Sequence, residues 1–169
     1  MSEHHKRVRA TGRGEPVENP ETSPAPTNEK LPDGQHADHW VLSAEERAKG
    51  FIRPVRRSYV HVGIRGPRYE LRDLDEKQQE LFGDAGYVKF EPYPKDEGPA
   101  TGRFWTQAQL DSVGKGCGAV TTMGPAIAET YARSPGFYGS TFCCGCHDYL
   151  PVGLEGEFVW DGTDERVGT

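Results

Sequence analysis

The sequence lacks any long apolar run. No segment approaches the roughly 18 consecutive apolar residues that a membrane-spanning helix requires, and the opening residues, MSEHHKRVRATGRG, contain no apolar stretch of a signal peptide. We therefore expect a protein that crosses no membrane and acts in the cytoplasm. Cysteines are seldom paired in disulfides in a reducing compartment, so the four cysteines require another explanation.

Apolar residues and positive charge are also scarce. Hydrophobic residues make up 34% of the 169 residues, whereas glycine and proline number 21 and 13. Such a chain builds a small core, and small cores are commonly stabilised by a metal or a covalent link. The net charge of −6 argues against a protein that coats nucleic acid non-specifically, because that activity requires a basic surface.

Composition divides the chain near residue 40. Residues 1–39 contain few apolar side chains and have prolines at positions 16, 20, 24, 26 and 32. Such a segment buries too little apolar surface to offset the entropy of ordering it. We predict a disordered N-terminal tail over residues 1–39 and one zinc-stabilised domain over residues 40–169.

Short elements follow one another within residues 40–169. Capping residues predict short helices after Ser43, Asp73 and Thr106, and Pro125 at a first helical position predicts a helix over 123–133. Alternating apolar and polar residues predict strands over 60–64, 87–93, 149–152 and 157–160. The expected fold class is α+β, a small mixed domain of short strands and short helices with a C-terminal zinc-ribbon-like hairpin.

The strongest chemical signal is the cysteine cluster in FCCGCHDYLP. In Cys143-x-x-Cys146, the two intervening residues allow one tight turn to direct both sulfurs to a single Zn²⁺ ion. A structural zinc site has four ligands, so two more are required. Cys117, between two glycines, is the expected third ligand. His61 is the favoured fourth ligand, with His147 and Cys144 as alternatives.

Two other chemistries use the same spacing. A thioredoxin-like dithiol needs its first thiolate at a helix N-terminus and further strands downstream, and only 23 residues follow Cys146. Cys143-x-x-Cys146-His147 also matches the attachment motif of c-type haem. Haem attachment normally occurs outside the cytoplasm, however, and needs longer helices than this sequence predicts. Zinc is the metal we expect.

Two further segments have binding potential. The region 51–72 is basic and contains aromatic residues, as in surfaces that bind single-stranded nucleic acid, and its candidate contacts are Arg53, Arg56, Arg57, Arg65 and Arg68. Ion pairing with the acidic remainder of the chain explains the same arginines. Thr121 and Thr122, before the helix at Pro125, are placed either to bind an anion or simply to cap that helix.

Several passages resemble a family of uncharacterised small bacteriophage proteins with a C-terminal C-x-x-C motif. They are RPVRRSYVHVGIR, GRFWTQAQL, GCGAVTTMGPAIAETYARSPGFYGSTFCCGC and GEFVWDGT. The resemblance covers about three quarters of the chain, beginning near Trp40. It implies a phage setting, in the cytoplasm of the host cell, and no particular chemistry.

The sequence favours a small zinc-binding accessory or interaction protein that acts on a protein or nucleic-acid partner. Motifs of the G-x-S-x-G, P-loop and H-E-x-x-H types are missing, so we lean against an enzyme. Two alternatives remain open: a zinc- or thiol-dependent enzyme, and a nucleic-acid-binding protein that uses the 51–72 arginines.

Overall fold

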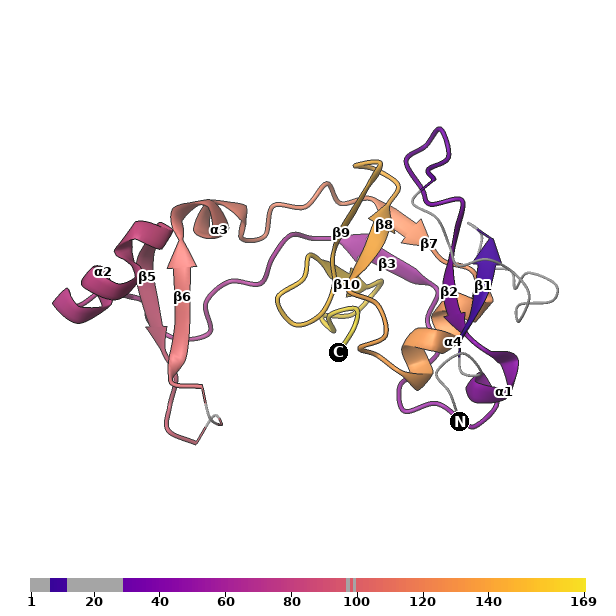
Figure 1. The fold of residues 1–169 in the computed structure, drawn as a ribbon, viewed down its shortest axis with the longest axis horizontal. Coiled ribbons are helices and arrows are strands. Elements are labelled where there is room, and N and C mark those ends of the chain that lie inside the picture. The colour runs from indigo at the N-terminus through magenta and orange to yellow at the C-terminus, as the bar shows by residue number, and fades with distance from the viewer. Residues whose placement is uncertain (1–6, 12–28, 97, 99) are drawn as a thin grey trace. The chain divides into compact units, whose positions relative to one another are not determined.

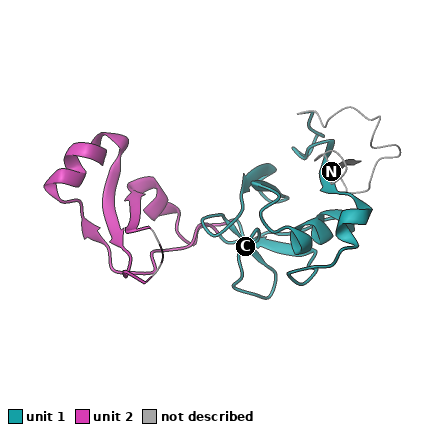
Figure 2. Cartoon of the chain, turned by 60° about the horizontal axis from the view of Figure 1, so that its bottom comes forward, with its two compact units in different colours: residues 1–62, 117–169 teal, residues 63–116 magenta. Residues whose placement is uncertain are grey.

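The structure is a computed structural model that describes residues 7–11, 29–96, 98 and 100–169, and its fold is mixed α+β (Figure 1). The chain forms two compact units (Figure 2). Unit 1 comprises residues 1–62 and 117–169, and unit 2 comprises residues 63–116. Within the range predicted as one domain, 40–169, residues 63–116 thus form a separate compact unit that is inserted into unit 1.

The predicted tail over residues 1–39 lies partly outside the described residues, at 1–6 and 12–28. Within the described part, strand β1 (Arg7–Thr11) pairs antiparallel with strand β2 (Asp38–Leu42). The boundary expected near residue 40 thus falls inside β2. Leu42 and Val41 of this strand are buried, and the Leu42 amide donates a hydrogen bond to Thr130 Oγ1.

The central sheet of unit 1 has three antiparallel strands. Strand β3 (Ser58–His61) lies between β10 (Phe158–Trp160) and β7 (Val120–Thr122). Tyr59 and Phe158 pack edge to face with ring centroids 5.3 Å apart, and Tyr131 packs in the same way on Trp160. Aromatic pairs of this geometry stabilise a core beyond the area that they bury.

Both helices described in unit 1 have the terminal residues that the sequence predicts, although the second begins at Pro125 and not at residue 123. Helix α1 (Ala44–Arg47) is capped by Ser43, which accepts a hydrogen bond from the Glu46 amide. Helix α4 (Pro125–Arg133) has proline at its first position and buries Ala128 and Tyr131 in the core. Proline is favoured there because the first helical amide has no partner within the helix.

The zinc-ribbon-like hairpin predicted at the C-terminus is not confirmed. Strand β9 (Asp148–Pro151) pairs with β8 (Ser140–Cys143), whereas β10 pairs with β3. The hairpin is therefore β8–β9, and the Cys143-x-x-Cys146 motif runs from the last residue of β8 into its turn. Pairing with β3 places Phe158 and Trp160 in the same buried cluster as Tyr59, and this burial explains why β10 lies there.

Unit 2 has its own three-stranded sheet, in the order β4 (Arg72–Asp73), β5 (Tyr87–Pro92), β6 (Gly102–Thr106). Its helices are α2 (Glu76–Phe82), a 3₁₀ turn η2 (Gly83–Ala85) and α3 (Gln107–Ser112). Thr106 caps α3 as predicted, but α2 is capped by Asp75 instead of Asp73, which belongs to β4.

A buried carboxylate organises the core of unit 2. Glu91 is 2% exposed and accepts hydrogen bonds from the Trp105 indole at 3.0 Å and from the amides of Arg68 and Tyr69. A buried carboxyl group is tolerated when several donors satisfy it.

In the described part of the chain, no helix has both the length and the apolar surface that crossing a membrane requires.

Candidate metal centre

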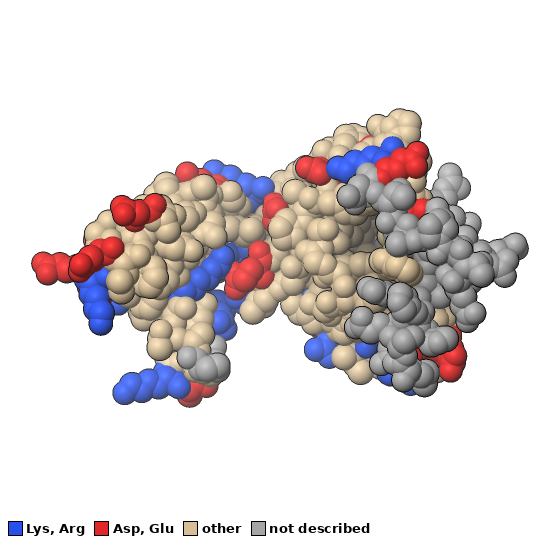
Figure 3. Space-filling model, in the orientation of Figure 1, with Lys and Arg blue, Asp and Glu red and all other residues tan. Residues whose placement is uncertain are grey.

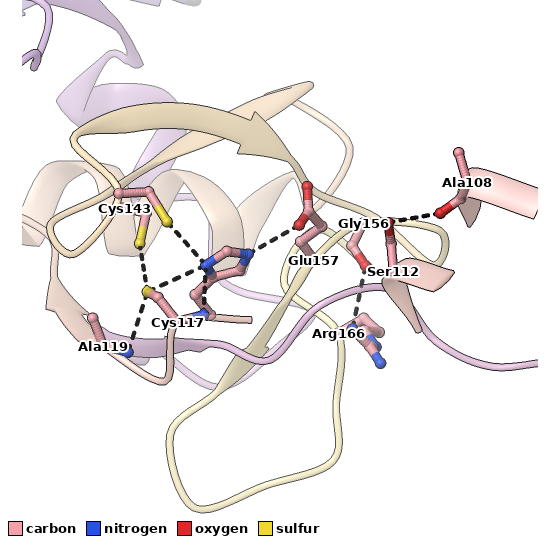
Figure 4. Close-up of polar contacts among 10 residues, drawn as sticks. Ala108, Ser112, Cys117, Ala119, Cys143, Gly156, Glu157 and Arg166 are labelled. Atoms are coloured by element: carbon pink, nitrogen blue, oxygen red, sulfur yellow. Dashed lines mark hydrogen bonds and ion pairs between the residues drawn. The ribbon is translucent and has the colours of Figure 1, made fainter. Parts of the chain in front are cut away.

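Four potential ligand atoms converge at one end of the central sheet of unit 1. The ligand atoms of His61, Cys117, Cys143 and Cys146 all lie within 4.8 Å of one another. His61 Nδ1 is 3.3 Å from Cys117 Sγ and 3.5 Å from Cys146 Sγ, and Cys117 Sγ is 3.4 Å from Cys143 Sγ (Figure 4). In a tetrahedral site with zinc–ligand bonds of 2.0–2.3 Å, neighbouring ligand atoms lie about 3.5–3.8 Å apart. The cluster is close to that geometry.

The four candidate ligands are held by the ends of two strands and by two loops. His61 ends β3, Cys117 lies in the loop before β7, Cys143 ends β8, and Cys146 lies in the β8–β9 turn. Residues 61 and 117 are held together by backbone hydrogen bonds, because His61 O accepts from the Gly118 amide and His61 N donates to Ala119 O. The sheet therefore supplies two ligands, and the hairpin supplies the other two.

Gly145 allows the hairpin turn to approach the third cysteine. A Cβ atom at this position would lie 2.7 Å from Ala119 Cβ and 2.8 Å from Cys117 Sγ, too close for either contact. The glycine within the C-x-x-C motif is thus explained by a close approach across the site, in addition to the backbone freedom that such turns require.

The His61 ring is oriented by an acid that the sequence alone did not single out. His61 Nε2 lies 2.9 Å from Glu157 Oε1, and Figure 4 shows Glu157 on the side of the ring opposite the sulfurs. Nδ1 accepts a hydrogen bond from the Cys117 amide, so the proton of the neutral ring is on Nε2, and a metal at Nδ1 would replace that hydrogen bond. This is the tautomer that binds a metal through Nδ1, and carboxylate partners of this kind are usual for metal-binding histidines.

The protonation of the cluster suits a cation. A hydrogen bond from the Ala119 amide is the main reason that the pKa of Cys117 is lowered to about 7, and a hydrogen bond with His61 lowers it further. Desolvation, together with hydrogen bonds to the sulfurs of Cys117 and Cys143, raises the pKa of Cys146 to about 12. Burial lowers the pKa of His61, but hydrogen bonds to Glu157 and Cys117 outweigh it and the net pKa is raised. Removing the proton from Cys146 beside the other sulfurs is therefore unfavourable unless a positive ion lies among them.

The two alternative fourth ligands lie elsewhere. Cys144 donates through Sγ to Val120 O and through its amide to Thr121 Oγ1. His147 Nδ1 is 3.1 Å from the carbonyl oxygen of Asp33, and the residue adopts a left-handed φ of 55°. Neither belongs to the four-residue cluster, so the structure brings together the ligand set that the sequence favoured, with His61 as the fourth member.

The five predicted nucleic-acid contacts are not gathered on one unit. Arg53, Arg56 and Arg57 belong to unit 1, whereas Arg65 and Arg68 belong to unit 2. Arg56 forms an ion pair with Glu165 and lies 4.9 Å from the ring centroid of Trp160, and Arg68 lies over two tyrosine rings of unit 2. On the face drawn in Figure 3, basic and acidic side chains are interspersed. An ion pair with Glu165 thus accounts for Arg56.

The donor set is compatible with a metal ion such as zinc. Three sulfurs and one imidazole nitrogen are soft or borderline ligands, which favour Zn²⁺ over Mg²⁺ or Ca²⁺. Four protein ligands complete a tetrahedral sphere, and a complete sphere leaves no position for water or substrate.

Comparison with known proteins found no matching family model, no matching curated protein and no matching solved structure.

Proposed function

We propose that this protein is a small accessory or interaction protein whose unit 1 is stabilised by a structural Zn²⁺ ion bound by His61, Cys117, Cys143 and Cys146. The observation that supports the proposal is the convergence of all four ligand atoms within 4.8 Å. The bacteriophage setting and a protein or nucleic-acid partner belong to the same proposal, on the basis of the sequence resemblance described above.

A structural role is favoured over catalysis by the number of ligands. Catalytic zinc sites typically have three protein ligands and a bound water, whereas this cluster offers four. Cys143 is fully buried in the core cluster with Tyr59 and Phe158, so the ion would connect the hairpin directly to the core. Zinc in small domains contributes about 10 kcal/mol to folding, because the unfolded chain has no preformed site.

The test is the zinc content of the purified protein, measured by elemental mass spectrometry, together with X-ray absorption of the zinc-loaded form. We expect one zinc per chain, with three sulfur ligands and one nitrogen ligand. The variants Cys143→Ser and Cys146→Ser should lose zinc and melt at a lower temperature. Cys144→Ser is the matched control because its sulfur lies outside the cluster.

Two results would reject the proposal. One is purified protein without metal whose Cys143 and Cys146 form a reversible disulfide, as a dithiol redox protein would. The other is a zinc site with three protein ligands and one water, because that coordination indicates catalysis.

A further inference from the structure

Unit 1 contains a cavity that the proposed zinc site does not use. Its volume is about 330 Å³, within the range of small-molecule sites. The cavity lies among β2, β7, α4 and β8, and none of the four metal ligands lines it. Seven of the fifteen described lining residues are aromatic or aliphatic, namely Tyr59, Tyr131, Tyr138, Phe142, Tyr149, Met123 and Ile127.

A buried hydroxyl on the cavity wall has no partner. Tyr131 is 3% exposed, and its Oη makes no hydrogen bond in the described structure. The hydroxyls of Tyr59 and Tyr138 donate to the carbonyl oxygens of Phe142 and Trp40. Burial raises the pKa of Tyr131, and Thr141, whose hydroxyl donates to Tyr59 Oη, opposes that rise. An unpaired buried hydroxyl is costly, so one that lines a cavity indicates a bound group that pairs with it.

A second unpaired atom lines the same cavity. Nε2 of His39, on β2, is buried and makes no hydrogen bond within the described part of the chain. Tyr131 and His39 both line the cavity, and each has one hydrogen-bonding atom without a partner among the described residues. A ligand with a hydroxyl or carbonyl oxygen at its inner end would satisfy them.

The edge of the cavity is positive. Arg57 is exposed and lines the cavity; its Nε donates to Met123 O, and it forms no ion pair with any described acid. The described lining contains no carboxylate. The N-terminus of α4 reaches the same wall at Gly124, which provides no side-chain cap. An arginine and a helix N-terminus together favour an anionic group.

We propose that this cavity binds a small molecule with one aromatic ring, an oxyanion at one end and a hydrogen-bonding oxygen at the other. The ring packs among the aromatic side chains, the oxyanion lies toward Arg57 and the α4 N-terminus, and the inner oxygen pairs with Tyr131 Oη. The carboxylate and phosphate forms of such a molecule share this chemistry, and the probes below distinguish them.

The first experiment is a titration of the full-length, zinc-loaded protein, followed by NMR, with 4-hydroxybenzoate, 4-hydroxyphenyl phosphate, benzoate and phenol. We expect saturable binding of 4-hydroxybenzoate or 4-hydroxyphenyl phosphate, with a dissociation constant of about 1 mM or tighter for ligands of this size. Benzoate, which lacks the inner oxygen, and phenol, which lacks the oxyanion, should bind more weakly. The preferred anion identifies the carboxylate or the phosphate class.

Two variants test the residue assignments. Tyr131→Phe should weaken 4-hydroxybenzoate about fivefold, leave benzoate unchanged and preserve or raise the melting temperature. Tyr138→Phe is its matched control, since that hydroxyl is already paired with Trp40 O. Arg57→Gln should weaken both anions and leave phenol unchanged, whereas Arg53→Gln, outside the cavity, should alter none of them.

The proposal is overturned if neither 4-hydroxybenzoate nor 4-hydroxyphenyl phosphate binds saturably to the wild-type protein. It is also overturned if both bind but Tyr131→Phe and Arg57→Gln, still folded by their melting curves, change no affinity. These outcomes are independent of the zinc assignment, because metal content is measured separately on the same samples.

Discussion

At the scale of single residues, the Glu157 carboxylate is the group that orients His61 toward the three sulfurs. Its Oε1 is 2.9 Å from Nε2, and the His61 side chain is 6% exposed. With the Nε2 proton held by Glu157, the lone pair of Nδ1 is directed to the cluster. Glu157 is therefore a positioning residue, whose effect reaches the metal through the imidazole ring.

Glu157→Gln should weaken zinc binding about 10- to 100-fold, the usual effect of removing such a partner. The measurement is competition with a chromogenic chelator at neutral pH. Asp164→Asn is the control, because it removes an exposed acid of the same C-terminal segment. An unchanged affinity in Glu157→Gln would show that the carboxylate does not orient the ligand.

His39 gives the stability of the protein a defined pH dependence. Burial lowers its pKa from 6.5 to about 4, with Asp38 raising it and His36 lowering it to smaller extents. The folded protein therefore resists a proton that the unfolded chain accepts. The free energy of unfolding should fall as pH decreases from about 6.5 to about 4, by about 3 kcal/mol in total, and should gain nothing from this residue at higher pH.

The comparison that isolates His39 is urea unfolding of the wild type and His39→Gln across this pH range. The difference between the two proteins cancels the contribution of zinc release, which both share. Parallel pH profiles would show that His39 titrates normally in the folded protein.

At the scale of elements, β2 and α4 are joined through one buried hydroxyl. Thr130 is fully buried; its Oγ1 accepts from the Leu42 amide at 3.1 Å and donates to Ala126 O at 2.7 Å. Thr130→Val preserves the shape but leaves that amide unsatisfied. We expect the free energy of unfolding to fall by about 1–3 kcal/mol.

Urea unfolding of the zinc-loaded protein measures this effect, and Thr130→Ser, which retains the hydroxyl, is the comparison. Thr130→Ser should be more stable than Thr130→Val, although it loses a methyl group. The opposite order would mean that the contribution of Thr130 comes from packing and not from the hydrogen bond to β2.

At the scale of the whole molecule, the inserted unit 2 begins and ends beside two of the proposed ligands. His61 lies just before the insertion, and Cys117 directly follows it. Backbone hydrogen bonds between His61 and the pair Gly118 and Ala119 join the two segments of unit 1 at the points where the insertion leaves and returns. The two segments of unit 1 therefore meet without any contribution from the insertion, and unit 1 contains all four ligands.

A shortened chain, with residues 63–116 replaced by a short glycine-containing turn, should fold and bind one zinc. We expect an affinity close to that of the full chain, because Glu157 and the four ligands are all retained. Zinc content and chelator competition on the purified protein are the measurements. A shortened chain without zinc, next to a full chain with it, would contradict the independence of unit 1.

The sequence by itself determined the local features of this protein. Ser43, Thr106 and Pro125 marked helix starts correctly, since capping involves residues only a few positions apart. The two-residue spacing of Cys143 and Cys146 indicated a shared ion for the same local reason. Cys117 and His61 were selected by side-chain chemistry, and the structure brings their ligand atoms into the cluster.

Only the tertiary structure decided which distant segments meet. The pairing of β10 with β3, and not with β9, places Glu157 against a histidine 96 residues away. The division at residues 63–116 and the cavity beside Tyr131 also depend on this packing. Strand partners are chosen by the apolar surface that the whole core buries, a property of no short segment, and local patterns therefore could not predict them.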